Sequence, residues 1–258
     1  MSAAHLPANH PFQPLFDKMA ADEVISSLTA YDYPTARLLD EAGIDLILVG
    51  DSLGMVFAGL DDTTGVTMEH MLYHTEVVAR GIKNALLVAD LPYHSYLSVE
   101  DAVNNAQRLM QAGAHAIKLE GGTTQLDKVE ALTRQGIPMV GHIGMLPQRV
   151  KEEGGYKKKG KTQHDADRLL RSAQDLEKAG AGAIVLESML AEVATRITQE
   201  INIPTIGIGA GNECNGQIRV IHDLVGAYPW FRPPFAKTYA DFAGDMGKAA
   251  QSFIEEIK

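Results

Sequence analysis

Four short apolar stretches in this chain each end on an acidic residue. They occupy residues 47–51, 86–90, 116–120 and 183–187, and the acids are Asp51, Asp90, Glu120 and Glu187. A continuous apolar run is typical of a parallel strand that is buried on both faces. Ligands of parallel sheets bind beyond the carboxyl ends of the strands. The pattern therefore predicts an α/β protein with carboxylates gathered at one site.

Strand-like and helix-like patterns alternate along the whole chain. Four further strands are predicted at 24–29, 138–142, 204–209 and 218–222, and helices at 33–42, 68–84, 99–112, 124–135, 165–179, 189–200 and 239–258. Eight βα units close a TIM barrel, and 258 residues is close to the usual size of one. We predict a single TIM-barrel domain over 1–258, with 1–20 as an N-terminal extension or helix. The segment 210–217 is too short for a full crossover helix, so we expect a reduced connection there.

Composition narrows the classes of partner. The formal net charge is −10, whereas proteins that bind the phosphate backbone of nucleic acids usually carry a basic field. The single cysteine, Cys214, rules out an intrachain disulfide framework and fits a reducing compartment. Residues 1–18 contain three prolines and no apolar core of a signal peptide. We expect a cytoplasmic protein that binds neither nucleic acid nor membrane.

The acids on three consecutive strands are candidates for a metal site. Asp51, Asp90 and Glu120 end the second, third and fourth predicted strands, which are neighbours in a barrel. Magnesium prefers oxygen ligands and usually takes one or two carboxylates together with water or substrate oxygens. Each acid alone has a structural alternative, which is to cap the following helix or to pair with a lysine. Together they favour a magnesium site.

Lys118 lies two residues before Glu120, so both side chains point to the same face of the strand. It has two candidate roles, a Schiff-base nucleophile or a fixed cation for a substrate carboxylate. A structural lysine paired with an interior carboxylate is the alternative, because a lysine inside an apolar strand needs a partner.

Two residues on the next strands are candidates for proton chemistry. His142 ends the fifth strand, where it either contacts substrate or a carboxylate or is a buried structural histidine. Glu187 ends the sixth strand, away from the three clustered acids. That separation favours a general base rather than a metal ligand.

The segment 151–161 contains three glycines and five lysines. It suits a mobile lid that attracts an anion, since active-site loops often carry glycine hinges. A solvated surface loop is the equally weighted alternative.

Seven short motifs, taken in order, resemble the ketopantoate hydroxymethyltransferase family. They are TAYDY at 29–33, VGDSLGM at 49–55, ADLP at 89–92, KLEGG at 118–122, GHIG at 141–144, LE at 186–187 and GIGAG at 207–211. The resemblance covers about residues 13–258, nearly the whole chain. It implies a TIM barrel of the phosphoenolpyruvate/pyruvate type.

The resemblance also implies an activity and a set of site residues. The family transfers a hydroxymethyl group from 5,10-methylenetetrahydrofolate to 3-methyl-2-oxobutanoate and gives 2-dehydropantoate, a step toward pantothenate. Magnesium would be held by Asp51, Asp90 and Glu120, and the 2-oxo acid by Asp51, Ser52, Asp90 and Lys118. Glu187 would accept the proton, and His142 would support the site. The family forms large homo-oligomers, often decamers.

This chemistry requires an enolate. A C–H bond beside a ketone is a weak acid, so the negative charge that forms when the proton leaves must be stabilised. A metal ion chelated by the keto and carboxylate oxygens does this as a Lewis acid. Lys118 then holds the substrate carboxylate as an ammonium and forms no imine.

Two rival readings come from other classes. A carbon–carbon lyase of the same barrel type typically uses an acidic cysteine in a Lys-Lys-Cys-Gly-His loop, whereas Cys214 lies in an Asn-Glu-Cys-Asn context. A catalytically silent ligand-binding barrel would have little reason to keep this many acids in a buried rim, because buried acids without a ligand cost stability.

Overall fold

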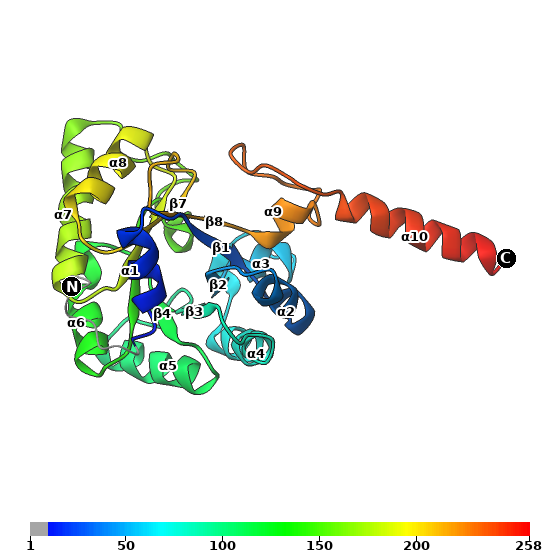
Figure 1. Cartoon of the computed structure of the whole chain (residues 1–258), viewed down its shortest axis with the longest axis horizontal. Helices are drawn as coiled ribbons and strands as arrows, with labels where there is room; N and C mark the ends of the chain where they lie inside the picture. Colours follow the sequence, from blue (N-terminus) through cyan, green and yellow to red (C-terminus); the bar gives the residue numbers. More distant parts are fainter. Residues whose placement is uncertain (1–9) are drawn as a thin grey trace. The chain divides into compact units, whose positions relative to one another are not determined.

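The structure, a computed structural model, describes residues 10–258, and within them eight parallel strands form a closed barrel in chain order (Figure 1). The strands are β1 (Ile25–Thr29), β2 (Leu46–Val49), β3 (Leu86–Asp90), β4 (Ala116–Lys118), β5 (Met139–Gly144), β6 (Ala183–Glu187), β7 (Thr205–Ile208) and β8 (Gly216–Arg219). The TIM-barrel prediction is confirmed. Of the predicted extension over 1–20, residues 1–9 lie outside the described part, and the rest contains helix α1 (Gln13–Ala20).

Burial explains why the strands read as continuous apolar runs. Every residue of β2 and β3 is buried. Such strands face the barrel interior on one side and the surrounding helices on the other, so both faces exclude water. The barrel closes where the backbone N–H of Ile25 donates to the carbonyl oxygen of Asn215, at 2.9 Å.

Helices follow most strands, as predicted. They are α2 (Tyr33–Glu41), α3 (Leu53–Val56), α4 (Met68–Ala79), α5 (Val99–Gln111), α6 (Leu126–Arg134), α7 (Gln163–Lys178) and α8 (Ala191–Glu200), with short 3-10 helices η2 (Thr63–Gly65), η3 (Thr123–Gln125) and η4 (Pro147–Arg149). Local sequence sets their ends. At α5 the Ser98 hydroxyl accepts from the backbone N–H of Asp101, and the Asp101 carboxylate accepts from the backbone N–H of Ser98. Gly113, with φ of 106°, ends the same helix.

The last strand differs from its prediction. We predicted it at 218–222, but β8 is Gly216–Arg219, and the apolar residues that follow begin helix α9 (Ile221–Val225). The predicted strand 218–222 therefore covers the end of β8 and the start of α9. A Cβ at Gly216 would collide with Ile25, so a glycine lets β8 lie close to β1. The short connection predicted between β7 and β8 is present and contains no helix.

The chain also divides into two compact units, Met1–Ile218 and Arg219–Lys258. The single domain over 1–258 stays a prediction. The second unit contains α9 and α10 (Phe242–Glu256) and is held by its own hydrogen bonds. The Thr238 hydroxyl donates to the Asp223 carbonyl oxygen at 3.0 Å, and the Tyr239 N–H to the Leu224 carbonyl oxygen at 2.8 Å.

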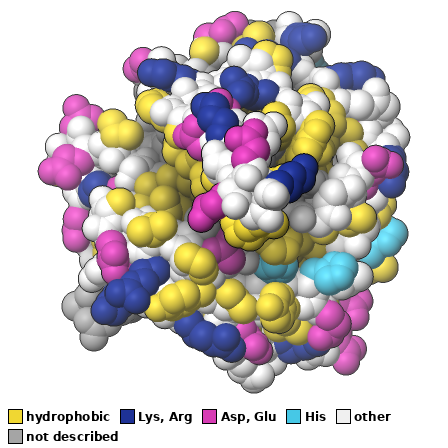
Figure 2. Space-filling view, turned by 90° about the vertical axis from the view of Figure 1, so that its right-hand side faces the viewer, with side chains coloured by type: hydrophobic (Ala, Val, Ile, Leu, Met, Phe, Trp, Pro, Cys, Tyr) yellow, Lys and Arg dark blue, Asp and Glu magenta, His cyan; other side chains and the backbone are white. Residues whose placement is uncertain are grey.

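Charged side chains of both signs are mixed on the molecular surface. On the face drawn in Figure 2, lysine and arginine side chains lie among acidic ones and do not form one continuous basic patch. No helix among residues 10–258 combines the length and the apolar character that crossing a bilayer requires.

Helix α1 packs against the amino-terminal end of the barrel strands. Phe12, at the start of this helix, is fully buried, as are Leu15 and Phe16. The Phe12 ring lies against Gly182, where an added Cβ would collide with the ring. Gly182 directly precedes β6, so Phe12 contacts the end of that strand opposite Glu187. The helix covers apolar groups that the strands alone would leave exposed.

We predict that Phe12→Ala lowers the free energy of unfolding by about 3–5 kcal/mol, because it removes a fully buried ring and leaves a cavity. Urea-induced unfolding, followed by circular dichroism, measures the change. Leu38→Ala is the matched control, since Leu38 is 67% exposed on α2, and it should change stability by no more than about 0.5 kcal/mol. Equal effects of the two substitutions would contradict this account of α1.

Candidate active site

The predicted acids lie at one rim of the barrel, at the carboxyl ends of β2, β3, β4 and β6. Asp90 is the last residue of β3 and Glu187 the last residue of β6, while Asp51 and Glu120 follow the ends of β2 and β4 by two residues. Register pairs Asp90 with Lys118 of β4. The parallel strands thus deliver all these side chains to the same end of the barrel.

Lys118 and Asp90 form a buried ion pair. The Lys118 Nζ atom is 2.8 Å from Asp90 Oδ1, and the two side chains are 5% and 3% exposed. Burial by itself would lower the pKa of Lys118, but the carboxylates of Asp90, Glu120 and Asp51 raise it above its usual value. Lys118 is therefore an ammonium. This favours the fixed-cation role over the Schiff-base nucleophile, which needs a neutral amine.

Three buried carboxylates share this corner of the rim. Burial raises the pKa of Asp51 well above its usual value, and repulsion from Asp90 and Glu120 adds to the rise. Burial also raises the pKa of Asp90, although Lys118 opposes it. At Glu120 burial acts in the same direction, but His142 and Lys118 outweigh it and the pKa is lowered. The repulsion between these neighbouring carboxylates would be relieved by a bound cation.

His142 joins two of the acids. Its Nδ1 atom is 3.4 Å from Glu120 Oε1 and its Nε2 atom is 3.2 Å from Glu187 Oε2. The second contact has the distance of an ion pair but lacks the alignment of a hydrogen bond, so Nε2 has no hydrogen-bond partner among the described residues. Burial and Lys118 lower the pKa of His142, but Glu120 and Glu187 raise it more, to about 9. The two carboxylates therefore favour the protonated ring, whereas Lys118, whose Nζ atom lies 3.4 Å from Nδ1, opposes it.

Direct contacts connect six of the seven predicted site residues in one cluster, namely Asp51, Asp90, Lys118, His142, Glu120 and Glu187. The seventh, Ser52, adjoins Asp51 in the chain. Its Oγ atom is 2.8 Å from the hydroxyl oxygen of Tyr31, which is 1% exposed. His74 Nδ1 in turn lies 2.6 Å from the Tyr31 carbonyl oxygen. Tyr31 lies in the first of the seven motifs, but nothing in the pattern showed that it fixes Ser52.

Gln148 is a site residue that the sequence did not reveal. It belongs to η4 and is 2% exposed. Its Nε2 atom donates to Asp51 Oδ2 at 2.8 Å and to the Leu91 carbonyl oxygen at 2.9 Å, and its backbone N–H donates to Glu120 Oε2 at 3.1 Å. An uncharged residue in a connecting segment carries no signal of this kind, so only the folded chain places it.

The segment 151–161 lies beside the rim. Lys151 Nζ is 2.8 Å from Asp62 Oδ2, and the Lys159 N–H donates to the Ser188 carbonyl oxygen at 2.9 Å. Burial, together with the charge of Glu187, raises the pKa of Tyr156. The later part of the segment is thus held next to Glu187, while its first residue contacts Asp62; the lid stays a prediction.

Among the described residues, no three His, Cys, Asp or Glu side chains are close enough together to hold a metal ion by themselves. Magnesium does not require three protein ligands in direct contact, because it keeps several of its waters. The donor set fits this ion. Asp51 and Asp90 are adjacent, since the Asp51 N–H donates to Asp90 Oδ2 at 3.2 Å, and all candidate ligands are carboxylate oxygens.

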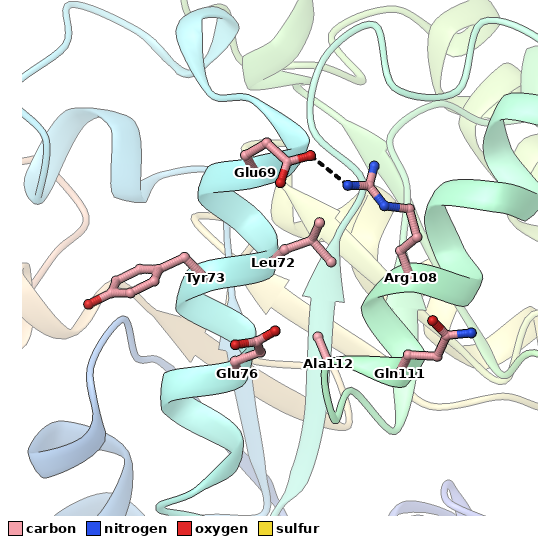
Figure 3. A pocket seen from close by; sticks show the side chains of 7 residues that line it. All are labelled: Glu69, Leu72, Tyr73, Glu76, Arg108, Gln111 and Ala112. Carbon is pink, nitrogen blue, oxygen red and sulfur yellow. Dashed lines mark hydrogen bonds and ion pairs between the residues drawn. The ribbon is translucent and has the colours of Figure 1, made fainter.

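One cavity lies away from this cluster and another borders it. One, of about 410 Å³, is lined by residues of α4 and α5 with the Glu69–Arg108 ion pair at its edge, and it contains none of the predicted site residues (Figure 3). The other, of about 250 Å³, has Glu120 and Gln148 in its wall together with Tyr93, Tyr96 and Lys128. The second cavity therefore adjoins the site.

Comparison with known proteins agrees with the fold and with the motifs. A sequence profile described as ketopantoate hydroxymethyltransferase matches residues 12–258. The chain belongs to this family. A 3-methyl-2-oxobutanoate hydroxymethyltransferase of Ignicoccus hospitalis is 51% identical over 245 residues, which cover 95% of this chain and 93% of the relative. The protein of that name from Dehalococcoides mccartyi strain CBDB1 is 54% identical over 235 residues, covering 90% of this chain and 84% of the relative.

Solved structures outside the family share its fold. Phosphonopyruvate hydrolase in complex with oxalate and Mg²⁺ superimposes with a TM-score of 0.64 at 17% identity, covering 84% of this chain and 83% of that chain. For 2,3-dimethylmalate lyase, a PEP mutase/isocitrate lyase superfamily member, the TM-score is 0.61 at 15% identity, with 97% and 88% covered. These likenesses agree with the predicted barrel fold.

We predict that Lys118→Met destabilises the protein, measured in EDTA, by about 3–5 kcal/mol, because it leaves the Asp90 carboxylate buried and unpaired. The double variant Lys118→Met/Asp90→Asn should lose less than the single one, since it leaves no orphaned charge at that position. Chemical denaturation of the four proteins of this cycle gives both values. Additive effects of the two substitutions would show that the pair does not interact.

Proposed function

We propose that this protein transfers a hydroxymethyl group from 5,10-methylenetetrahydrofolate to 3-methyl-2-oxobutanoate and gives 2-dehydropantoate, as a step of pantothenate biosynthesis. The relatives named 3-methyl-2-oxobutanoate hydroxymethyltransferase support the reaction. The observation that carries it is the contact cluster at the rim, which combines a buried ammonium, adjacent carboxylates and the separate acid Glu187. Water supplies the hydroxyl oxygen, and tetrahydrofolate leaves.

Magnesium is the cofactor that this donor set fits best. Asp51 and Asp90 would hold it, with Glu120 as the third oxygen donor. When bound, the ion stabilises the negative charge that develops on the keto oxygen of the substrate. The carboxylates themselves stay ordered through Lys118 and His142, which pair with Asp90 and Glu120.

The protein side chains divide the remaining work. The Lys118 ammonium and the Ser52 hydroxyl, with Asp51 and Asp90, bind the 2-oxo acid and fix its orientation. Glu187 removes the proton from C3, and the carbon that loses it attacks the one-carbon unit of the folate. The His142 ring, whose Nε2 atom is 3.2 Å from Glu187 Oε2, orients that carboxylate. Proton transfer by a positioned base contributes about 10²- to 10⁴-fold to a rate.

The position of the single cysteine does not support the lyase alternative. Cys214 lies in the segment that joins β7 to β8 and is 6% exposed. Burial raises the pKa of its thiol. The lyases' acidic cysteine belongs to an active-site loop, whereas the loop next to this site, 151–161, contains no cysteine.

We further propose that the protein acts in the cytoplasm as a homo-oligomer, with a decamer as the expected state, and that it binds neither nucleic acid nor membranes. The family supports the assembly, and the net charge of −10 supports the absence of nucleic acid.

The purified protein should form 2-dehydropantoate from the two substrates, because the rim combines a candidate base, a buried ammonium and the candidate metal ligands. Product is measured by mass spectrometry. EDTA should abolish its formation, and added Mg²⁺ should restore it. A protein that binds the oxo acid in calorimetry but forms no product with Mg²⁺ and folate present would be the silent binding barrel.

The variant Glu187→Gln should slow exchange of the substrate C3 proton with deuterated water by about 10²-fold or more, because it removes the base and keeps the shape. Proton NMR follows the exchange, and calorimetry should show little change in binding of Mg²⁺ and the oxo acid. Glu192→Gln, an exposed acid at the start of α8, is the matched control. Unchanged exchange in Glu187→Gln would remove Glu187 from its role.

A further inference from the structure

Asp51 differs from the other two carboxylates in the kind of group that holds it. Asp90 is paired with Lys118, and Glu120 with His142. Among the residues that the structure describes, no cationic side chain forms an ion pair with the Asp51 carboxylate, and the side chain that donates to it is the Gln148 amide, at 2.8 Å. A neutral donor fixes the direction of a carboxylate and leaves its charge in place for a cation.

Gln148 holds two candidate metal ligands at once. The side-chain amide reaches Asp51 at the end of β2, and the backbone N–H of the same residue reaches Glu120 at the end of β4. The third bond, from Nε2 to the Leu91 carbonyl oxygen, fixes the amide against the segment after β3. One residue of η4 therefore ties together the ends of three neighbouring strands.

Two partners select which way the Gln148 amide faces. Its Nε2 atom donates to Asp51 Oδ2 and to the Leu91 carbonyl oxygen, and neither of these groups can donate to an amide oxygen put in its place. The Tyr96 hydroxyl, which could pair with either end of the amide, donates to Gln148 Oε1 and lies 3.4 Å from the Glu120 carbonyl oxygen. It therefore holds the amide in the orientation that the two acceptors select.

We infer that Gln148, held at its amide oxygen by the Tyr96 hydroxyl, is a positioning residue that holds Asp51 and Glu120 in place for the divalent ion. This inference rests on the proposed magnesium site. Groups that orient metal ligands from outside typically account for about 10- to 100-fold in metal affinity or activity. On this inference both residues act through the carboxylates that they hold.

The test measures Mn²⁺ binding by electron paramagnetic resonance and Mg²⁺ binding by calorimetry, on the full chain without substrate. Gln148→Leu removes both side-chain donor bonds and should weaken binding about 10- to 100-fold. Tyr96→Phe removes only the hydroxyl that holds the amide oxygen and should weaken binding less, in the same direction. Tyr93→Phe is the matched control: the same change in the same segment removes a hydroxyl that donates to Glu152, and metal affinity should stay at the wild-type value.

Turnover separates positioning from a merely structural role. For both variants the Mg²⁺ concentration that gives half-maximal activity should rise, while kcat at saturating Mg²⁺ recovers most of its wild-type value. A lower melting temperature with unchanged metal affinity in both variants would overturn the inference. If the wild-type protein itself bound no divalent ion, the magnesium proposal would fail first and this inference with it. Wild-type affinity in both variants, beside a wild type that binds the ion, would overturn this inference alone.

Discussion

The buried ion pair between Lys118 and Asp90 is the interaction on which the arrangement of the rim depends. Charges taken out of water are costly, and only a well-placed partner offsets the cost. The register of β3 against β4 places these two residues side by side, at 2.8 Å. With that pair in place, the remaining carboxylates are fixed by different donors, Glu120 by His142 and Asp51 by Gln148. The negative charge that is left over supports the proposal that the rim binds a cation.

The strands supply the charges, but the connecting segments set their directions. Gln148 comes from η4 and Tyr96 from the segment between β3 and α5, while Tyr31 follows β1 and holds Ser52. The segment 151–161 lies against Asp62 and Ser188, beside the site. This division of labour suits TIM barrels, where a rigid strand framework carries loops that differ between enzymes. It also explains why proteins with other names, only 15–17% identical to this chain, share its fold.

Strand identity was readable from the chain because buried parallel strands are nearly all apolar. The runs that end in Asp51, Asp90, Glu120 and Glu187 became β2, β3, β4 and β6, and the acids met at one rim because parallel strands all end on the same side. The eighth strand was misplaced, since the run 218–222, in which Ile218, Val220 and Ile221 are apolar, spans the end of β8 and the start of α9. Apolar character alone does not separate a strand from a short helix.

The sequence by itself determined the class of barrel, the family and the residue types at the rim, because hydrophobic periodicity and short ordered motifs are local properties of the chain. Which groups touch was decided only by the tertiary structure. The contact between Gln148 and Asp51 joins residues 97 positions apart, and that between His142 and Glu187 joins the ends of two strands. Such pairs leave no local pattern, since hydrogen-bond geometry and the balance of buried charges arise only when the strands and their connections have been brought together.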